Sequence, residues 1–167
     1  MFRPVARFIE TGSLLLGRPA EEVRKAQRSA MEEATQFGTR RVQGRTPQGV
    51  SGAAGGLLPS IGPEVLESSK GVVGIIGTAS PYGLVVEKGR RPKAKMPPAG
   101  VLTEWIQLKL GVSREEAERI ELPIRRKIYH RGTKGAFMFE KTIEEDWPDF
   151  QRIFESSGVR IARELER

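Results

Sequence analysis

The chain has 167 residues, of which 38% are hydrophobic and 29% are charged. A chain of this length can fold as one ordinary domain with a sizeable core, and its composition excludes a wholly disordered protein and an integral membrane protein. The absence of cysteine excludes disulfides and thiolate metal sites, and the formal net charge of +7 favours polyanions or acidic protein surfaces as partners.

Residues 1–18 are expected to form an N-terminal arm of the mature protein. Their apolar part resembles a signal peptide, but Arg7 and Glu10 interrupt it and no convincing cleavage site follows. No apolar run approaches the ~20 residues that a membrane helix needs, so no membrane partner is expected. Residues 19–167 are predicted to form a single domain with extended loops at residues 42–57 and 88–99.

A long helix is predicted over residues 19–41. Its apolar residues recur at spacings of three and four, namely Val23, Ala26, Ala30, Ala34 and Phe37. Pro19 suits the first turn, and Gly38 is a plausible end of the helix. Residues 43–56 are rich in glycine and are predicted to form a flexible loop.

Short strands are predicted at residues 57–61, 72–78 and 84–87, and they form an antiparallel meander. The last third of the chain is helical. A helix over residues 101–110 is followed by one that a capping box at Ser113 opens and that Pro123 kinks or breaks. A final helix begins near residue 139 and restarts at Trp147. The predicted fold class is α+β: a small antiparallel sheet packed against a long N-terminal helix and C-terminal helices.

The run YGLVVEKGRRPKAKMPP, residues 82–98, is the most informative part of the chain. A short apolar strand ends on a single acid, and a basic loop follows that prolines stiffen. We expect this loop to touch neighbouring subunits or to line a channel through its charged residues, which are Glu87, Arg90, Arg91, Lys93 and Lys95.

No catalytic, cofactor-binding or metal-binding residues are predicted, and the chain is expected not to be an enzyme. The one histidine, His130, has no neighbour that would tune it as a base. The acid pairs at residues 115–116 and 144–146 lie on predicted helices beside lysines or arginines, which is typical of a solvated face. The GAAGG run at residues 52–56 lacks the lysine of a phosphate-binding loop.

Three basic clusters remain: residues 40–45, the loop cluster at residues 90–95, and residues 125–127. A charge run alone is most often a solvated surface. The loop cluster differs because four cations share one flexible stretch with no acid among them. It is suited to attracting DNA phosphates without reading sequence, and equally to gripping an acidic face on a neighbouring subunit.

The order of several short motifs resembles a known family. TPQGVSGAAGGLLPSI is similar to that family's threonine-proline loop, and YGLVVEKGRRP to its tyrosine, valine-glutamate, glycine and basic-proline signature. The segments MPPAGVLTEW, IRRKIYHRGTKG and FMFEKT resemble a subgroup that carries an inserted tryptophan-bearing helix. The family is the tail-component, or tail-completion, proteins of long-tailed bacteriophages and prophages.

The resemblance implies a structural protein of the virion neck, without catalysis or cofactor. Such a subunit would be assembled in the host cytoplasm as a homo-oligomeric ring, expected to be six-fold, around the channel for DNA. Its partners would be connector and tail-tube proteins, and DNA would pass without sequence readout. The place in the neck stays open between a tail terminator, a head-tail joining protein and another ring.

The loop cluster is expected to face acids of the next subunit, such as Glu144, Glu145 and Asp146. The alternative function is a nucleic-acid-binding protein without sequence specificity that uses its basic loops directly. The two are distinguished by salt, because affinity for DNA falls steeply as salt rises when phosphates carry the binding.

Overall fold

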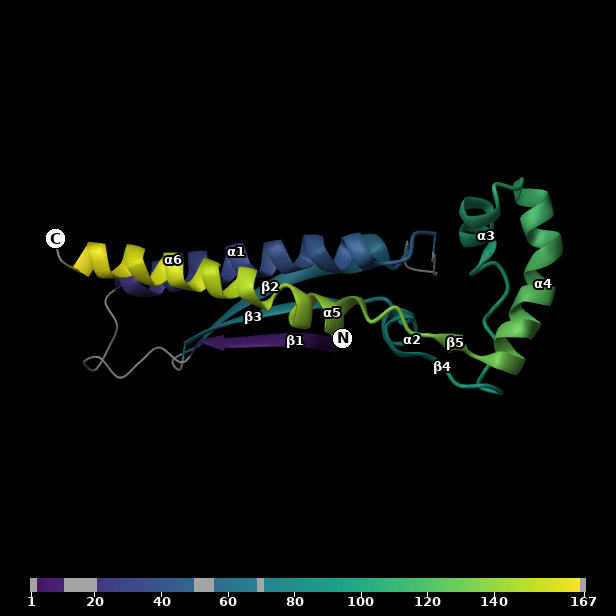
Figure 1. Ribbon diagram of the computed structural model, residues 1–167, viewed down its shortest axis with the longest axis horizontal. Coiled ribbons are helices and arrows are strands. Elements are labelled where there is room, and N and C mark those ends of the chain that lie inside the picture. The colour runs from purple at the N-terminus through teal and green to yellow at the C-terminus, as the bar shows by residue number, and fades with distance from the viewer. Residues whose placement is uncertain (1–2, 11–20, 50–55, 69–70, 166–167) are drawn as a thin grey trace. The chain divides into compact units, whose positions relative to one another are not determined.

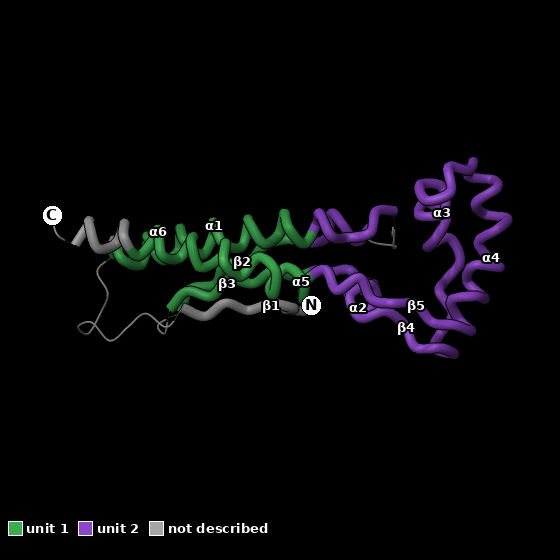
Figure 2. The backbone as a smooth tube through the Cα atoms, in the orientation of Figure 1, with its two compact units in different colours: residues 1–42, 62–77, 139–167 green, residues 43–61, 78–138 purple. Residues whose placement is uncertain are grey.

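The computed structural model describes residues 3–10, 21–49, 56–68 and 71–165 (Figure 1). The chain divides into two compact units (Figure 2). Unit 1 comprises residues Met1–Val42, Gly62–Gly77 and Phe139–Arg167, and unit 2 comprises Gln43–Ile61 and Thr78–Met138. The predicted α+β class is confirmed, with a long N-terminal helix, C-terminal helices and little strand.

Unit 1 contains a three-stranded sheet in the order β1-β3-β2. Strand β1 spans Arg3–Glu10, β2 spans Ile61–Ser68 and β3 spans Gly71–Thr78. Two residues link β2 to β3, a link short enough only for an antiparallel hairpin. The central position of β3 explains why most of its residues are buried, and the prediction of this strand is confirmed.

The prediction of a strand at residues 57–61 is wrong in its bounds. Residues Leu58–Ser60 form a short 3-10 helix, η1, and β2 begins only at Ile61. Pro63 is tolerated because β2 is an edge strand, where a missing amide breaks no central ladder. Of the predicted N-terminal arm, residues 3–10 form β1, whereas residues 11–18 lie outside the described residues.

Helix α1 spans Glu21–Arg45 and packs against β3 through a stripe that shares only Ala30 and Ala34 with the predicted one. Its buried side is defined by small and polar residues at spacings of three and four, namely Gln27, Ala30, Met31, Ala34, Thr35, Gly38, Thr39 and Val42. Phe37 and Ala26, which the apolar pattern placed inward, are only half-buried. Small side chains let the helix approach the sheet closely.

Gly38 does not end α1, which continues to Arg45. A Cβ atom at Gly38 would lie less than 3.0 Å from side-chain atoms of Ile76 and Phe150. On the facing strand, a Cβ atom at Gly74 would crowd Met31 and Thr35 in the same way. The glycine is therefore required for close packing of the helix on the sheet, and it is not a termination signal.

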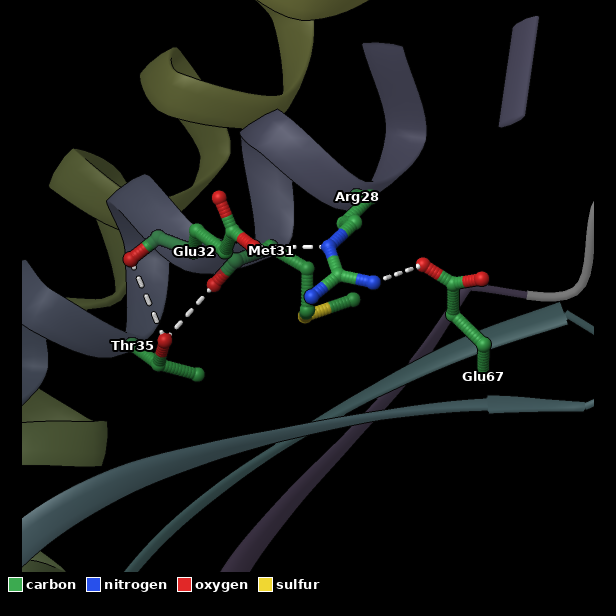
Figure 3. A network of polar contacts seen from close by, with 5 residues as sticks. All are labelled: Arg28, Met31, Glu32, Thr35 and Glu67. Atoms are coloured by element: carbon green, nitrogen blue, oxygen red, sulfur yellow. Dashed lines mark hydrogen bonds and ion pairs between the residues drawn. The ribbon is translucent and has the colours of Figure 1, made fainter. Parts of the chain in front are cut away.

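An exposed ion pair also joins α1 to the sheet (Figure 3). The Arg28 guanidinium donates to Glu32 at 2.8 Å and to Glu67 of β2 at 2.6 Å. These hydrogen bonds, first to Glu32 and then to Glu67, raise the pKa of Arg28. Beside them the Thr35 hydroxyl donates to the Met31 carbonyl at 2.8 Å, which satisfies a buried polar group within the helix.

Helices α5 (Met138–Glu145) and α6 (Trp147–Leu165) confirm the predicted helix near residue 139 and its restart at Trp147. Helix α6 lies beside α1 (Figure 1), and the buried Phe150 ring meets Phe37 edge to face at 5.3 Å. Asp146, the residue between α5 and α6, is buried and accepts a hydrogen bond from Arg41 of α1 at 2.6 Å. The expectation that Asp146 faces another subunit is therefore wrong, because its carboxylate is used within the chain.

The first helix in the Thr78–Met138 segment of unit 2 lies where a strand was predicted. Residues Gly83–Lys88 form α2, so the strand prediction at residues 84–87 is wrong. Gly83 and Glu87 are its buried residues, a spacing of four that suits a helix and not an alternating strand. The apolar run Leu84 to Val86 favours a strand locally, but packing of Gly83 against Thr78 and Leu57 overrides that preference.

Helices α3 (Thr103–Leu110) and α4 (Arg114–Arg131) pack against each other within unit 2. The capping box at Ser113 is confirmed, and Gly111 ends α3 in the left-handed conformation. Of the predicted kink or break at Pro123, the break is wrong, because α4 continues through the proline. The Gly100 amide donates to the Glu121 carboxylate before the proline, and the Lys93 amide donates to the Tyr129 carbonyl after it. These two hydrogen bonds hold the helix on both sides of Pro123.

Candidate interaction surface

A two-stranded ribbon organises the segment that carries the predicted site. Strand β4 (Gly89–Arg90) pairs antiparallel with β5 (Thr133–Lys134). The pairing continues past the strands, since Ala136 donates its amide to the Val86 carbonyl at 2.8 Å and Phe137 to the Glu87 carbonyl at 3.0 Å. The motif segments YGLVVEKG and RGTKGAF, far apart in the sequence, are therefore joined backbone to backbone.

Glycines are needed at this ribbon for a geometric reason. Gly89 (φ 77°, ψ −171°) and Gly132 (φ 71°, ψ −168°) adopt a backbone conformation that is essentially restricted to glycine. A Cβ atom at either position would also collide with a carbonyl oxygen of the opposite strand, that of Thr133 or of Arg90. Gly89 thus lets the chain pass directly from α2 into β4, and a helix, not the predicted strand, leads into it.

The predicted site residues lie in different surroundings. Glu87 is buried in α2, with 4% of its surface exposed, and Arg90 is half-buried in β4. In contrast, Arg91, Lys93 and Lys95 are exposed. The three exposed cations are available to a partner, whereas Glu87 is part of the packed base from which the loop leaves.

The loop that follows β4 is attached to the second half of α4. The Lys93 amide donates to the Tyr129 carbonyl at 2.6 Å, and Arg125 Nε donates to the Pro97 carbonyl at 2.7 Å. Within the loop, the Arg90 guanidinium donates to the Lys95 carbonyl. The structure therefore brings the loop cluster and the cluster at residues 125–127 together, which their sequence separation did not indicate.

The remaining cluster, at residues 40–45, belongs to α1. Arg41 is bonded to Asp146 and lies 5.6 Å from the centre of the Phe37 ring, so it stabilises unit 1.

Glu121 is a buried carboxylate whose structural role the sequence did not reveal. It is 6% exposed on α4, and its two oxygens accept hydrogen bonds from the amides of Gly100 and Leu102 at 2.9 and 3.0 Å. These bonds hold the end of the loop where α3 begins. Its partners are about twenty residues away and are reached only through the packing of α3 on α4, so no local pattern indicates the role.

Replacing Glu121 with alanine is expected to destabilise unit 2 by about 2–3 kcal/mol, because two amides lose a charged acceptor. Urea denaturation followed by circular dichroism measures the change. Glu118→Ala on the same helix is the control, because Glu118 pairs only with the exposed Arg114 and should cost under about 1 kcal/mol. Equal costs for the two variants would contradict the assigned role of Glu121.

The charge of the chain is divided unequally between the two units. Unit 1 carries 14 basic and 15 acidic residues, whereas unit 2 carries 14 basic and 6 acidic residues. The formal surplus of +7 is therefore the net of −1 in unit 1 and +8 in unit 2. The composition alone did not show this separation, because it depends on which segments fold together.

The described residues do not assemble a metal centre, since no group of three or more histidine, aspartate or glutamate side chains could hold an ion. His130 is exposed, and its ring lies edge to face with Tyr129 at 5.1 Å. That the chain is not an enzyme stays a prediction.

Comparison with family models, with curated proteins and with solved structures gave no match to this chain. The resemblance to tail-completion proteins therefore stays a prediction. No helix in the described part of the chain is both long enough and apolar enough to span a membrane.

Proposed function

We propose that this chain is a structural subunit of the bacteriophage neck, which assembles as a ring around the DNA channel and binds connector and tail-tube proteins. In this proposal it acts as a tail-completion, tail-terminator or head-tail joining protein, and it performs no catalysis. The ring is six-fold, and the chain belongs to the virion.

The observation that carries the proposal is the convergence of the family-like motifs in unit 2. The YGLVVEKG segment and the RGTKGAF segment pair through β4 and β5, and Thr46 of the TPQG segment donates to the sulfur of Met138 in FMFEKT at 3.1 Å. Residues of four family-like motifs thus make two pairwise contacts within unit 2, although FMFEKT continues into unit 1.

Exposed apolar side chains in unit 2 also support a role in assembly. Leu84, Leu108, Leu110 and Leu122 are between 44% and 60% exposed. Large apolar side chains favour contact with another protein surface where they form one patch, and Leu108 and Leu110 belong to α3 and Leu122 to α4, two helices that pack against each other. Head-to-tail contact between two different patches of one subunit produces a closed ring when the rotation is right.

The proposal is tested on phage particles purified from a culture that produces an affinity-tagged copy of the chain. Mass spectrometry is expected to find the chain in intact particles, and electron cryo-microscopy to place it in a ring between the connector and the first tail-tube ring. If the chain is absent from particles and present only in the cell extract, the proposal is wrong.

Reversing the charge of Arg91 is expected to reduce the yield of tailed particles by about tenfold, if losing its attraction to an anionic group of the assembly, on protein or DNA, costs about 1.4 kcal/mol per subunit. Arg91 is the better choice than Arg90, because Arg90 also holds the Lys95 carbonyl and its loss would disturb the loop. Plaque counts and electron microscopy measure the effect. Arg24→Glu, an exposed cation of α1, is the matched control. Normal particle yield from Arg91→Glu would exclude this residue from a subunit contact.

A further inference from the structure

The basic residues that unit 2 brings together form one unneutralised surface. Residues 88–103 and 122–139 contain ten lysines and arginines and no acid. Two of the ten, Arg90 and Arg125, are half-buried and donate to backbone carbonyls. The other eight are exposed and form what we call the basic surface: Lys88, Arg91, Lys93, Lys95, Arg126, Lys127, Arg131 and Lys134. Within the described part of the chain, none of the eight makes an ion pair.

We infer that the basic surface binds the phosphate backbone of duplex DNA without reading its sequence. The inference depends on the charges of unit 2 alone and goes beyond the proposed neck function. If the chain does form a neck ring, the basic surface is the part of the subunit that contacts DNA.

The cations are held in place by the fold. On α4, Arg126, Lys127 and Arg131 are exposed within an arc of about 140° around the helix axis, on a different side from Arg125, which donates to the Pro97 carbonyl. The paired strands β4 and β5 bring Lys134 opposite Gly89, next to Lys88. Because these segments are hydrogen-bonded to each other, binding a phosphate array does not require a free loop to be ordered first.

Lys93 is held at some energetic cost. Its backbone has φ 59°, in the left-handed region that glycine adopts without strain, and its amide is bonded to Tyr129. A lysine at this position adds a cation to the loop where glycine would be the relaxed choice. The lysine at this position therefore adds positive charge to the loop at a cost in local backbone stability.

Phosphate, and not an acidic protein face, is the partner that the composition of this surface favours. Of the large hydrophobic side chains in residues 88–103 and 122–139, all of which the structure describes, only Leu122 and Phe137 are exposed, and both lie outside the stretch 125–134 that holds the cations of α4 and β5. Protein interfaces concentrate their binding energy in buried apolar and aromatic residues and are depleted in lysine. Contacts to nucleic-acid phosphates, in contrast, come from lysine and arginine and need no apolar centre. The exposed leucines of unit 2 lie outside residues 88–95 and 125–134 and remain available to protein partners.

The experiment measures binding of the full chain to a fluorescein-labelled DNA duplex of mixed sequence by fluorescence anisotropy. Between 50 and 200 mM KCl the affinity should fall by about a thousandfold or more, as expected for six or more phosphate contacts. The triple variant Lys95→Glu, Arg126→Glu, Lys127→Glu should bind at least ~100-fold more weakly at 50 mM, and its salt slope should be shallower by about three.

The matched control is Arg24→Glu, Lys25→Glu, Arg40→Glu, which changes the net charge equally on exposed positions of α1. It should lose less than about threefold in affinity. A second test variant with glutamine at residues 95, 126 and 127 covers the case in which charge reversal unfolds the chain, as circular dichroism would show. This glutamine variant should lose at least ~10-fold, because three phosphate contacts are removed without added repulsion.

Three results would overturn the inference. One is binding that is weak or insensitive to salt, and another is an equal loss in the test and control triples, which would show a response to net charge alone. The third is displacement of DNA by polyglutamate at equal charge concentration, which would assign the surface to an acidic protein. Light scattering on the same samples reports whether the chain forms rings. Rings that do not bind DNA refute only the inference. DNA binding by a chain that mass spectrometry does not find in phage particles refutes only the neck function.

Discussion

Replacing Gly132 with alanine is expected to destabilise unit 2 by about 3 kcal/mol or more. The side chain would force a residue into a conformation that only glycine adopts at ordinary cost, and its Cβ atom would meet the Arg90 carbonyl and the backbone of Arg91. The β4–β5 ribbon should separate at this point, and with it the attachment of the basic loop. The fluorescence of Trp105 in a Trp147→Phe background reports unfolding of unit 2 in urea.

Gly111→Ala is the matched control for this prediction. Gly111 also ends a helix with a positive φ, 66°, but nothing lies within 4 Å of the position of its added Cβ. The left-handed conformation alone should cost about 1 kcal/mol. If the two variants lose the same stability, crowding at the ribbon is not the reason for glycine at residue 132.

Gly38→Ala and Gly44→Ala are expected to change stability in opposite directions, although both glycines lie in α1. At Gly38 the added methyl group would push against Ile76 and Phe150 in the core, and overpacking costs about 1–3 kcal/mol even after the better helix propensity is counted. At Gly44 nothing lies within 4 Å, so alanine should stabilise the helix by about 1 kcal/mol.

Thermal and urea denaturation measure this difference. Trp147 in a Trp105→Phe background is the probe of unit 1 for Gly38→Ala, and Trp105 in a Trp147→Phe background is the probe of unit 2 for Gly44→Ala. A stabilising effect of both substitutions would show that Gly38 is merely a poor helix residue and makes no required contact with the sheet. A destabilising effect at Gly38 alone would show that it is a contact between helix and sheet.

Regular elements with strong local signals were predictable. The capping box at Ser113, the β-branched run of β3 and the restart at Trp147 all depend on residues next to each other, and all are confirmed. The errors occur where packing outweighs a local preference. Leu84 to Glu87 has the composition of a strand but forms a helix, and Pro123 should break a helix that contacts on both sides maintain.

The inward side of α1 shows the same limit in a different way. The apolar pattern selected Phe37 and Ala26, whereas the buried positions include Gln27, Thr35 and Thr39. Periodicity of hydrophobic residues cannot identify a buried face made of small and polar residues, because closeness of approach and not hydrophobicity selects them.

For the candidate surface, the sequence by itself determined that the loop after residue 87 is basic, contains no acid and follows a glycine that lets the chain turn. These are properties of neighbouring residues, so no fold is needed to see them. Only the tertiary structure decided that Glu87 is buried, that Arg90 and Arg125 fasten the loop, and that α4 adds its cations to the same surface. The physical reason is that the electrostatic potential of a surface depends on how close its charges lie in space and not on their separation in the sequence. The hydrogen bonds from Lys93 to Tyr129 and from Arg125 to Pro97 bring the loop and α4 close together.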